Sequence, residues 1–265
     1  MYIKLPFQLI CFEIITDCLD IIDNLSFLYG KYCCSDCNSA ENIFTIEISK
    51  TDNMYYVSAN NTSIVTEHPL QSIRDIIYEN TKFFSSVIAF HGAAIEYNNE
   101  AYLFFSPTTG GKTTLTTYLL SKGCGYISDD CVLVNYLDFT VIPFTTPIHL
   151  RLGGVDVLKA LNITMPSMMK YIDDGQIKRY IYSPSKDIKS PIKIKNIYFI
   201  ERNEEKNNIE TLSGVNLLLQ LMKSVIVPYS ISKELVNIFM SIAKERCQKI
   251  YYKDMDYVYS TITIE

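Results

Sequence analysis

The chain has 265 residues, of which 48% are hydrophobic and 20% are charged, proportions that are ordinary for a folded protein with a substantial core. Its net charge of −5, with no basic cluster to offset it, excludes non-specific binding to nucleic acid, so no nucleic-acid partner is expected. The N-terminal apolar run 5–15 is too short to cross a membrane, and it lacks the basic flank and the cleavage site of a signal peptide. We therefore expect a cytoplasmic protein without a membrane partner.

Eight cysteines are too few for a disulfide scaffold in a chain of this length, and in a reducing compartment we expect most of them to be buried thiols. The cluster 33–37 (CCSDC) contains one C-x-x-C. A zinc site would need a second pair at suitable spacing, whereas the nearest other cysteines are Cys18 and Cys124. No metal site is expected at this cluster.

Residues 1–84 are expected to form a small α+β region without catalytic residues, which we interpret as a lid or a docking domain. Its strongest signal is a hairpin, in which two segments of alternating apolar and polar residues flank a turn at 51–53. Pro69 opens the second expected helix. The expected strands cover 3–15, 42–50, 54–59 and 63–68, and the expected helices cover 17–30 and 69–84.

Residues 85–265 are expected to form one nucleotide-binding catalytic domain around a glycine-containing loop. The apolar segment 102–105 predicts a buried strand, and a helix begins near residue 113. Between them lies SPTTGGKTT (106–114), which matches a phosphate-binding loop except that a serine stands at the usual leading glycine. Such loops hold phosphates with backbone N–H groups at a helix N-terminus, where the helix dipole favours negative charge.

Each position of the loop has an expected role toward a nucleoside triphosphate. Gly110 and Gly111 let the backbone approach the phosphates closely. Lys112 reaches the β- and γ-phosphates, and the Thr113 hydroxyl ligates Mg²⁺. The other expected nucleotide contacts are Ser106, Thr108, Thr109 and Thr114. The alternative is a plain glycine turn with a solvated lysine, but turns rarely need two glycines followed directly by Lys-Thr.

Two adjacent carboxylates, Asp129 and Asp130, lie within the next expected strand, 125–136. At a sheet edge beside a phosphate loop, one acid can hold Mg²⁺ and the other can accept the proton of an attacking hydroxyl. Ser-Asp-Asp is also good turn chemistry, so a purely structural turn is the alternative. His91 precedes the loop strand and would reach the same edge, although a lone histidine is usually structural.

The order of these motifs resembles the HPr kinase/phosphorylase family, and in particular its shortened relatives found with peptide-modifying systems. The resemblance covers 90–147 and rests on His-Gly-Ala-Ala, the loop SPTTGGKTT, Lys-Gly after the helix, and YISDDCVLV. It implies an α/β (α+β) fold: a P-loop kinase core similar to the nucleotide-binding half of phosphoenolpyruvate carboxykinase. The sheet of such a core is mixed or antiparallel, in contrast to the parallel sheet of a standard P-loop NTPase.

The resemblance also implies roles for individual residues. Lys112 would hold the β- and γ-phosphates, and Thr113 would ligate Mg²⁺. The acid pair matches the family's catalytic acids, with Asp129 assigned as the base and Asp130 assigned to the metal side, although these two roles could be exchanged. His91 matches the family histidine near the transferred phosphoryl group.

Two departures from the family pattern affect the expected chemistry. Ser106 replaces the leading loop glycine, and His149 stands where the family has an acid two residues before Arg151. Loss of that acid makes a kinase without phosphorolysis the expected enzyme, with Arg151 as a γ-phosphate contact.

The remainder of the chain is expected to support this site. An insertion over 159–184 carries Lys178 and Arg179, which could meet an acidic peptide or simply be solvated. Further strands are expected over 192–202, 249–254 and 257–265, and helices over 211–227 and 232–247, the second capped by Ser232.

The sequence therefore predicts a kinase that uses ATP and Mg²⁺ and transfers the γ-phosphoryl group to a serine or other hydroxyl of a peptide or small protein. One alternative is a kinase for a free amino acid or nucleoside. Another is a nucleotide-binding regulator or scaffold that no longer turns over. A GTPase is disfavoured because no N-K-x-D base-reading motif occurs. A homo-oligomer is compatible with the sequence.

Overall fold

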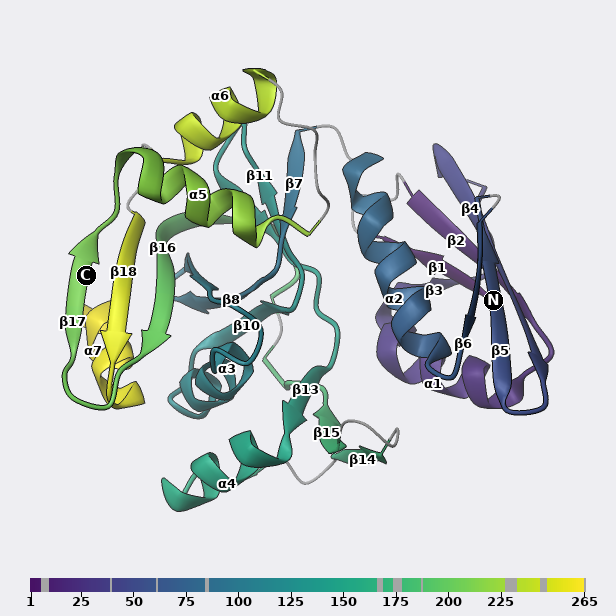
Figure 1. Ribbon diagram of the computed structural model, residues 1–265, viewed down its shortest axis with the longest axis horizontal. Coiled ribbons are helices and arrows are strands. Elements are labelled where there is room, and N and C mark those ends of the chain that lie inside the picture. Colours follow the sequence, from purple (N-terminus) through teal and green to yellow (C-terminus); the bar gives the residue numbers. More distant parts are fainter. Residues whose placement is uncertain are drawn as a thin grey trace. The chain divides into compact units, whose positions relative to one another are not determined.

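The computed structural model describes residues 1–5, 10–38, 40–60, 62–83, 86–165, 169–173, 178–186, 188–226, 233–243 and 247–264. The chain divides into two compact units, Met1–Ser85 and Ser86–Glu265, and each is described by itself (Figure 1). Both units combine helices with sheets that contain parallel and antiparallel neighbours, which confirms a mixed α/β fold class. Among the described residues, no helix combines the length and the apolar character needed to cross a membrane.

The first unit is a six-stranded sheet with the strand order β3-β1-β2-β4-β5-β6 and two helices packed on it. β2 and β4 run parallel, and the other neighbours run antiparallel. Each helix buries residues spaced by four, Ile21 and Leu25 in α1 and Ile73 and Ile77 in α2, as expected for an amphipathic helix. The elements are β1 Tyr2–Lys4, β2 Ile10–Thr16, α1 Leu19–Tyr29, β3 Cys33–Cys34, β4 Asn42–Thr51, β5 Met54–Ala59, β6 Thr62–Thr66 and α2 Pro69–Glu79.

The predicted hairpin of this unit is present, but one predicted strand is wrong. β4 and β5 pair with Thr51 opposite Met54, and Asp52 adopts a φ of 55° in the turn. The single strand predicted over 3–15 is two strands, β1 and β2, which pair antiparallel with Ile3 opposite Phe12. This pairing gives hydrogen-bond partners to backbone N–H and C=O groups along the edge of β2 that faces β1, and one continuous strand would leave these groups unpaired.

One pair of cysteines in the first unit is oxidised. Cys11 on β2 forms a disulfide with Cys37, and the other six cysteines are thiols. The expectation that most of the eight are buried thiols is wrong, because three of the six thiols are half-buried or exposed. The other three thiols, Cys124, Cys131 and Cys247, are buried in the second unit. In the described part of the chain, no group of three His, Cys, Asp or Glu side chains is arranged to hold a metal ion.

The second unit is built on a nine-stranded mixed sheet. The main strand order is β10-β8-β9-β16-β12-β11-β7, while β18 pairs with β16 and β17 pairs with β18. β9, β16 and β18 run parallel to one another, and the remaining neighbours run antiparallel. The strands are β7 Val87–Phe90, β8 Gly92–Tyr97, β9 Glu100–Phe105, β10 Gly125–Asp129, β11 Val132–Asn135, β12 Thr140–Ile142, β16 Ile192–Arg202, β17 Asn208–Thr211 and β18 Cys247–Tyr252.

Helices cover both faces of this sheet, which explains why its central strands are buried along their length. On β9, Leu103 and Phe105 belong to the core beneath α5 and α6, and Tyr102 and Phe104 belong to the core beneath α3, α4 and α7. Figure 1 shows α5 and α6 on one side of the sheet and α3 on the other. The helices are α3 Lys112–Ser121, α4 Leu152–Ala160, α5 Gly214–Ser224, α6 Lys233–Ile242 and α7 Met255–Ile264.

A separate small sheet carries the segment around Arg151. Its order is β13-β15-β14, all antiparallel, with β13 spanning Ile148–Arg151, β14 spanning Lys170–Asp173 and β15 spanning Lys178–Tyr182. The predicted insertion over 159–184 therefore contributes two strands to this sheet.

Two sequence predictions in the second unit are wrong, and one predicted helix begins later than expected. The strand predicted over 257–265 is helix α7, because Met255, Val258 and Ile262 follow helical spacing and pack into the core. Residues 208–211 form β17, so α5 begins later than predicted. The strand predicted over 125–136 is two strands, which separate at the acid pair. The predicted cap Ser232 lies outside the described residues.

Candidate active site

The loop 106–111 connects the buried strand β9 to the N-terminus of α3, where the backbone N–H groups of the first turn lack helical partners. Gly111 occupies the N-cap position with a φ of 88°, and Thr109 has a φ of 68°. A Cβ on Gly110 would overlap Ser106 Oγ, and one on Gly111 would lie 2.9 Å from the Tyr252 hydroxyl. Neither position therefore leaves room for a side chain, which explains why both residues are glycine.

Ser106 is accommodated in place of the usual glycine because the chain turns later in the loop. The N–H of Gly110 donates a hydrogen bond to the Pro107 carbonyl at 3.0 Å, which closes the turn. The hydroxyl of Ser106 donates to the same carbonyl at 3.2 Å. The serine thus occupies the first loop position without supplying the tight turn itself.

The ammonium group of Lys112 lies inside this loop. Nζ donates to the Ser106 carbonyl at 2.8 Å and lies 3.2 Å from Nε2 of His91. Lys112 is 6% exposed, and burial lowers its pKa, while Asp129 and Asp130 act in the opposite direction. A buried cation surrounded mainly by carbonyl oxygens is suited to exchange those oxygens for the oxygens of a phosphate.

His91 lies between β7 and β8 and connects the lysine to the acid pair. Its Nδ1 is 3.2 Å from the backbone carbonyl oxygen of Asp130, and its Nε2 faces the ammonium of Lys112. Because a carbonyl only accepts and an ammonium only donates, these contacts assign a neutral ring with its proton on Nδ1. The His91 backbone N–H donates to the Ser224 carbonyl at 2.6 Å, which anchors this position to α5.

The acid pair lies where β10 ends and the chain turns toward β11. Asp129 is 3% exposed, and burial together with the neighbouring Asp130 raises its pKa to about 8. A hydrogen bond from the Thr113 side chain and the charge of Lys112 favour the ionised form. The Oδ1 atom of Asp129 is buried without a hydrogen-bond partner among the described residues. Asp130 is half-buried, with a φ of 75°.

These residues fit a Mg²⁺ ion. The hydrogen bond between Thr113 and Asp129 brings a hydroxyl and a carboxylate together beside the loop, and the unpartnered oxygen of Asp129 is the type of ligand that Mg²⁺ prefers. Within the described part of the chain, Lys112 is the cation whose charge acts on the two carboxyls. Mg²⁺ keeps several waters and is usually bound by one or two carboxylates and the phosphates of its nucleotide, so a third protein acid is not required.

Arg151 lies at the end of β13, where it is exposed and pairs in register with Arg179. It is not among the described residues that line the two cavities beside the loop. Instead, Gly153 and Gly154, which follow it in α4, line one of them. The contact of Arg151 with a γ-phosphate therefore stays a prediction.

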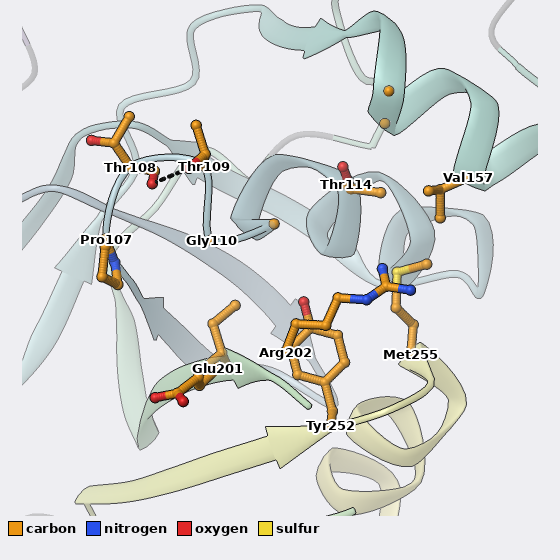
Figure 2. Close-up of a pocket in the computed structure, with 14 residues that line it drawn as sticks. Pro107, Thr108, Thr109, Gly110, Thr114, Val157, Glu201, Arg202, Tyr252 and Met255 are labelled. Carbon is orange, nitrogen blue, oxygen red and sulfur yellow. Dashed lines mark hydrogen bonds between the residues drawn. The ribbon is translucent and has the colours of Figure 1, made fainter. Parts of the chain in front are cut away.

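A cavity of about 410 Å³, the Tyr252 cavity, adjoins the loop and the first turn of α3 (Figure 2). Figure 2 shows Arg202, Tyr252 and Met255 across the cavity from the loop. Its other walls come from α4 and from the end of β16. The lining residues are Pro107, Thr108, Thr109, Gly110, Gly111, Thr114, Gly153, Gly154, Val157, Ile200, Glu201, Arg202, Tyr252 and Met255.

A second cavity of about 380 Å³, the His91 cavity, adjoins the first residues of the same loop. Phe105 and Phe199 supply apolar surface, and α5 supplies a polar wall of Gln220, Lys223 and Ser224. The other lining residues are His91, Ser106, Pro107, Thr108, Ile200, Glu201 and Lys249.

We did not predict the residues that β16, β18 and α5 bring to these cavities, because those segments were expected only to support the site. Both strands were predicted, but their parallel pairing beside the loop is visible only in the structure. β16 runs parallel to β9 with Phe199 opposite Phe105, so its last three residues continue alongside the loop. β18 is parallel to β16 with Tyr252 opposite Arg202. Ligands commonly bind at the carboxyl ends of parallel strands.

Comparisons with known proteins leave the family open. No protein-family model and no curated protein matches the chain. Among solved structures, the Hpr(Ser) kinase/phosphatase from Coxiella burnetii is similar over 66% of this chain and 96% of that chain, with 11% sequence identity and a TM-score of 0.34. We draw no conclusion about function from a likeness this weak.

Proposed function

We propose that the chain is an ATP-dependent kinase that transfers the γ-phosphoryl group to a hydroxyl, with a serine of a peptide or small protein as the acceptor. The observation that carries this proposal is the convergence of three separate segments: the loop with the start of α3, His91, and the acid pair. Nζ of Lys112 contacts His91 and the Ser106 carbonyl, His91 contacts the turn at Asp130, and Asp129 contacts Thr113. A plain structural turn needs none of these contacts.

Binding of the phosphates relies on the loop and the start of α3. The free N–H groups of the helix N-terminus and the ammonium of Lys112 supply positive charge where the phosphates lie. Mg²⁺, when bound, supplies further charge neutralisation for the phosphate oxygens. Catalysis of phosphoryl transfer consists mainly of such positioning and charge stabilisation.

The contact between Thr113 and Asp129 favours an exchange of the roles first assigned to the two acids. A P-loop hydroxyl shares its metal ion with one nearby carboxylate, and the carboxylate in contact with Thr113 is Asp129. Burial raises the pKa of Asp129, and an adjacent divalent cation would reverse that rise. We therefore assign Asp129 to the metal side and Asp130, which is more exposed, to the acceptor side.

In the proposed transfer, the acceptor hydroxyl oxygen forms a bond to the γ-phosphorus while the bond from that phosphorus to the β-bridging oxygen breaks. The hydroxyl proton passes to the carboxylate of Asp130, and ADP leaves. His91 holds Lys112 in place through Nε2 and holds the Asp130 turn through Nδ1. It acts as a positioning residue in this scheme.

The test is incubation of the protein with γ-labelled ATP and Mg²⁺ in the presence of free serine, serine-containing peptides or a cell extract, followed by identification of the labelled product by mass spectrometry. Labelled phosphoserine in a peptide supports the proposal. Labelling of a free amino acid or nucleoside would identify a small-molecule kinase instead. Binding of ATP with no transfer to any candidate would indicate a nucleotide-binding regulator and would overturn the proposal.

A further inference from the structure

The two cavities adjoin different parts of the phosphate loop. The Tyr252 cavity includes Gly111 and Thr114, at the helix end of the loop, whereas the His91 cavity includes Ser106, at its strand end. Pro107 and Thr108 line both. One loop therefore separates two spaces, each large enough for part of a small ligand.

The position of Lys112 indicates the direction in which a nucleotide would lie between them. In phosphate loops the backbone cradles the α- and β-phosphates, while the lysine reaches the β- and γ-phosphates. Nζ of Lys112 contacts His91 and the Ser106 carbonyl, and both of these residues line the His91 cavity. The γ-phosphate end therefore points toward the His91 cavity, which leaves the Tyr252 cavity for the nucleoside.

We propose that the His91 cavity is the acceptor site and that it selects a hydroxyl acceptor with an anionic group, such as a carboxylate, close to the hydroxyl. This inference rests on the proposed kinase function. The anionic group can be an acidic residue beside a serine in a peptide or the α-carboxylate of a free amino acid, since both present the same chemistry.

The charges that line the cavity carry this inference. Lys223 of α5 and Lys249 of β18 contribute two positive charges, and Glu201 contributes one negative charge, in a protein whose net charge is −5. Lys249 is held in place, since its Nζ lies 2.8 Å from Glu201 and 4.4 Å from the centre of the Tyr251 ring. Lys223 is exposed and forms no ion pair within the described part of the chain. Its charge is therefore available to an incoming anion.

The neighbours of Lys223 fit the same role. Gln220 lies one helical turn earlier on α5 and also lines the cavity, so an amide and an ammonium are presented together. The backbone carbonyl of Ser224, the next residue, accepts a hydrogen bond from the N–H of His91 at 2.6 Å. This bond fixes the distance between the end of α5, which carries Gln220 and Lys223, and the histidine beside the transferred phosphoryl group.

The test compares acceptors of different charge on wild-type protein and on Lys223→Glu. The probes are free L-serine and three serine peptides that differ only in having glutamate, glutamine or lysine on both sides of the serine. Lys206→Glu is the matched control, because it makes the same charge change at an exposed turn residue that lines neither cavity. The measurements are kcat/KM for each acceptor and the KM for ATP.

We expect wild-type protein and Lys206→Glu to prefer the glutamate peptide or free serine over the lysine peptide. Lys223→Glu should lower kcat/KM for the preferred anionic acceptor by about tenfold, raise it for the lysine peptide, and leave the KM for ATP unchanged. Comparison of the glutamate peptide with free serine identifies the source of the anionic group.

Two results would overturn this inference while leaving the proposed kinase function in place. Equal losses for all acceptors would mean that Lys223 acts on the phosphates, and unchanged selectivity would mean that the acceptor binds elsewhere. Failure of the wild-type protein to transfer phosphate to any probe or extract component, despite measured ATP binding, would instead refute the kinase function and the acceptor site with it.

Discussion

Nζ of Lys112 lies 3.2 Å from Nε2 of His91, a contact between a loop lysine and a histidine from a different strand connection. Because the ammonium can only donate, the histidine must accept with a deprotonated Nε2, and its Nδ1 proton is directed to the Asp130 carbonyl. This contact links the loop 106–111 to the acid pair through one neutral imidazole.

Replacement of Lys112 by alanine should lower the rate of phosphoryl transfer by about 10²–10³-fold or more and should weaken ATP binding. The reason is that the buried ammonium is the principal positive side chain within the loop. Initial rates with labelled ATP and a binding titration measure the two effects. Lys206→Ala, an exposed lysine that lines neither cavity, is the control and should behave as wild type. Normal transfer by Lys112→Ala would contradict the assignment of the loop.

The two acids should separate in their effects. Asp129→Asn should weaken the dependence of ATP binding on Mg²⁺, because the carboxylate in contact with Thr113 is lost. Asp130→Asn should leave ATP binding intact and lower kcat by about 10²–10⁴-fold, the usual contribution of a general base. ATP titrations at several Mg²⁺ concentrations, together with single-turnover rates, distinguish the variants. The opposite pattern would restore the original assignment of Asp129 as the base.

The raised pKa of Asp129 predicts how stability depends on pH. The pKa moves from a reference value of 3.8 to about 8, so between these pH values the folded protein holds a proton that the unfolded chain has released. The free energy of unfolding should therefore fall as the pH rises from about 4 to about 8, by up to about 1.4 kcal/mol per pH unit.

Urea unfolding at several pH values measures this slope. Asp129→Asn should flatten it, whereas Asp156→Asn on the exposed side of α4 should retain it. Addition of ATP with Mg²⁺ should also reduce the slope, since a bound cation favours the ionised carboxylate. An unchanged slope in Asp129→Asn would show that another group is responsible.

Gly111 should tolerate no side chain. Alanine at this position would have to adopt a φ of 88° and would place its Cβ 2.9 Å from the Tyr252 hydroxyl. Gly111→Ala should lower stability by about 1 kcal/mol or more and weaken ATP binding. Tyr252→Phe removes the hydroxyl, so the double variant should recover part of the stability that Gly111→Ala loses. Thermal unfolding of the single and double variants measures the coupling, and strictly additive effects would argue against the contact.

Arg202, rather than Arg151, should affect the nucleotide. Both arginines are exposed, but Arg202 lines the Tyr252 cavity at the end of β16, whereas Arg151 on the small sheet lines neither cavity. Arg202→Ala should raise the KM for ATP by about tenfold through loss of a charge-assisted contact, and Arg151→Ala should leave it close to wild type. Steady-state kinetics with varied ATP compare the two. A larger effect of Arg151→Ala on the KM for ATP would mean that Arg151, rather than Arg202, contacts the nucleotide.

Much of the candidate site follows from local sequence signals. The loop 106–114 was recognisable because its glycines, lysine and threonine have fixed positions relative to a strand and a helix, and the structure has that strand and helix. The same locality explains why the hairpin at Asp52 was predicted correctly. Prediction failed for α7, where the β-branched residues of 257–264 favour a strand but burial of Val258 and Ile262 selects a helix.

By itself, the sequence predicted a phosphate loop and identified His91 and the acid pair as candidates, because those signals depend on residue type and short-range spacing. Only the tertiary structure decided which atoms meet. In the folded chain, His91 Nε2 contacts Lys112, and Asp129 rather than Asp130 contacts Thr113. Lys223 and Lys249 line the cavity beside the histidine. The physical reason is that strand pairing and helix packing join segments far apart along the chain, and contacts of that kind leave little trace in local periodicity.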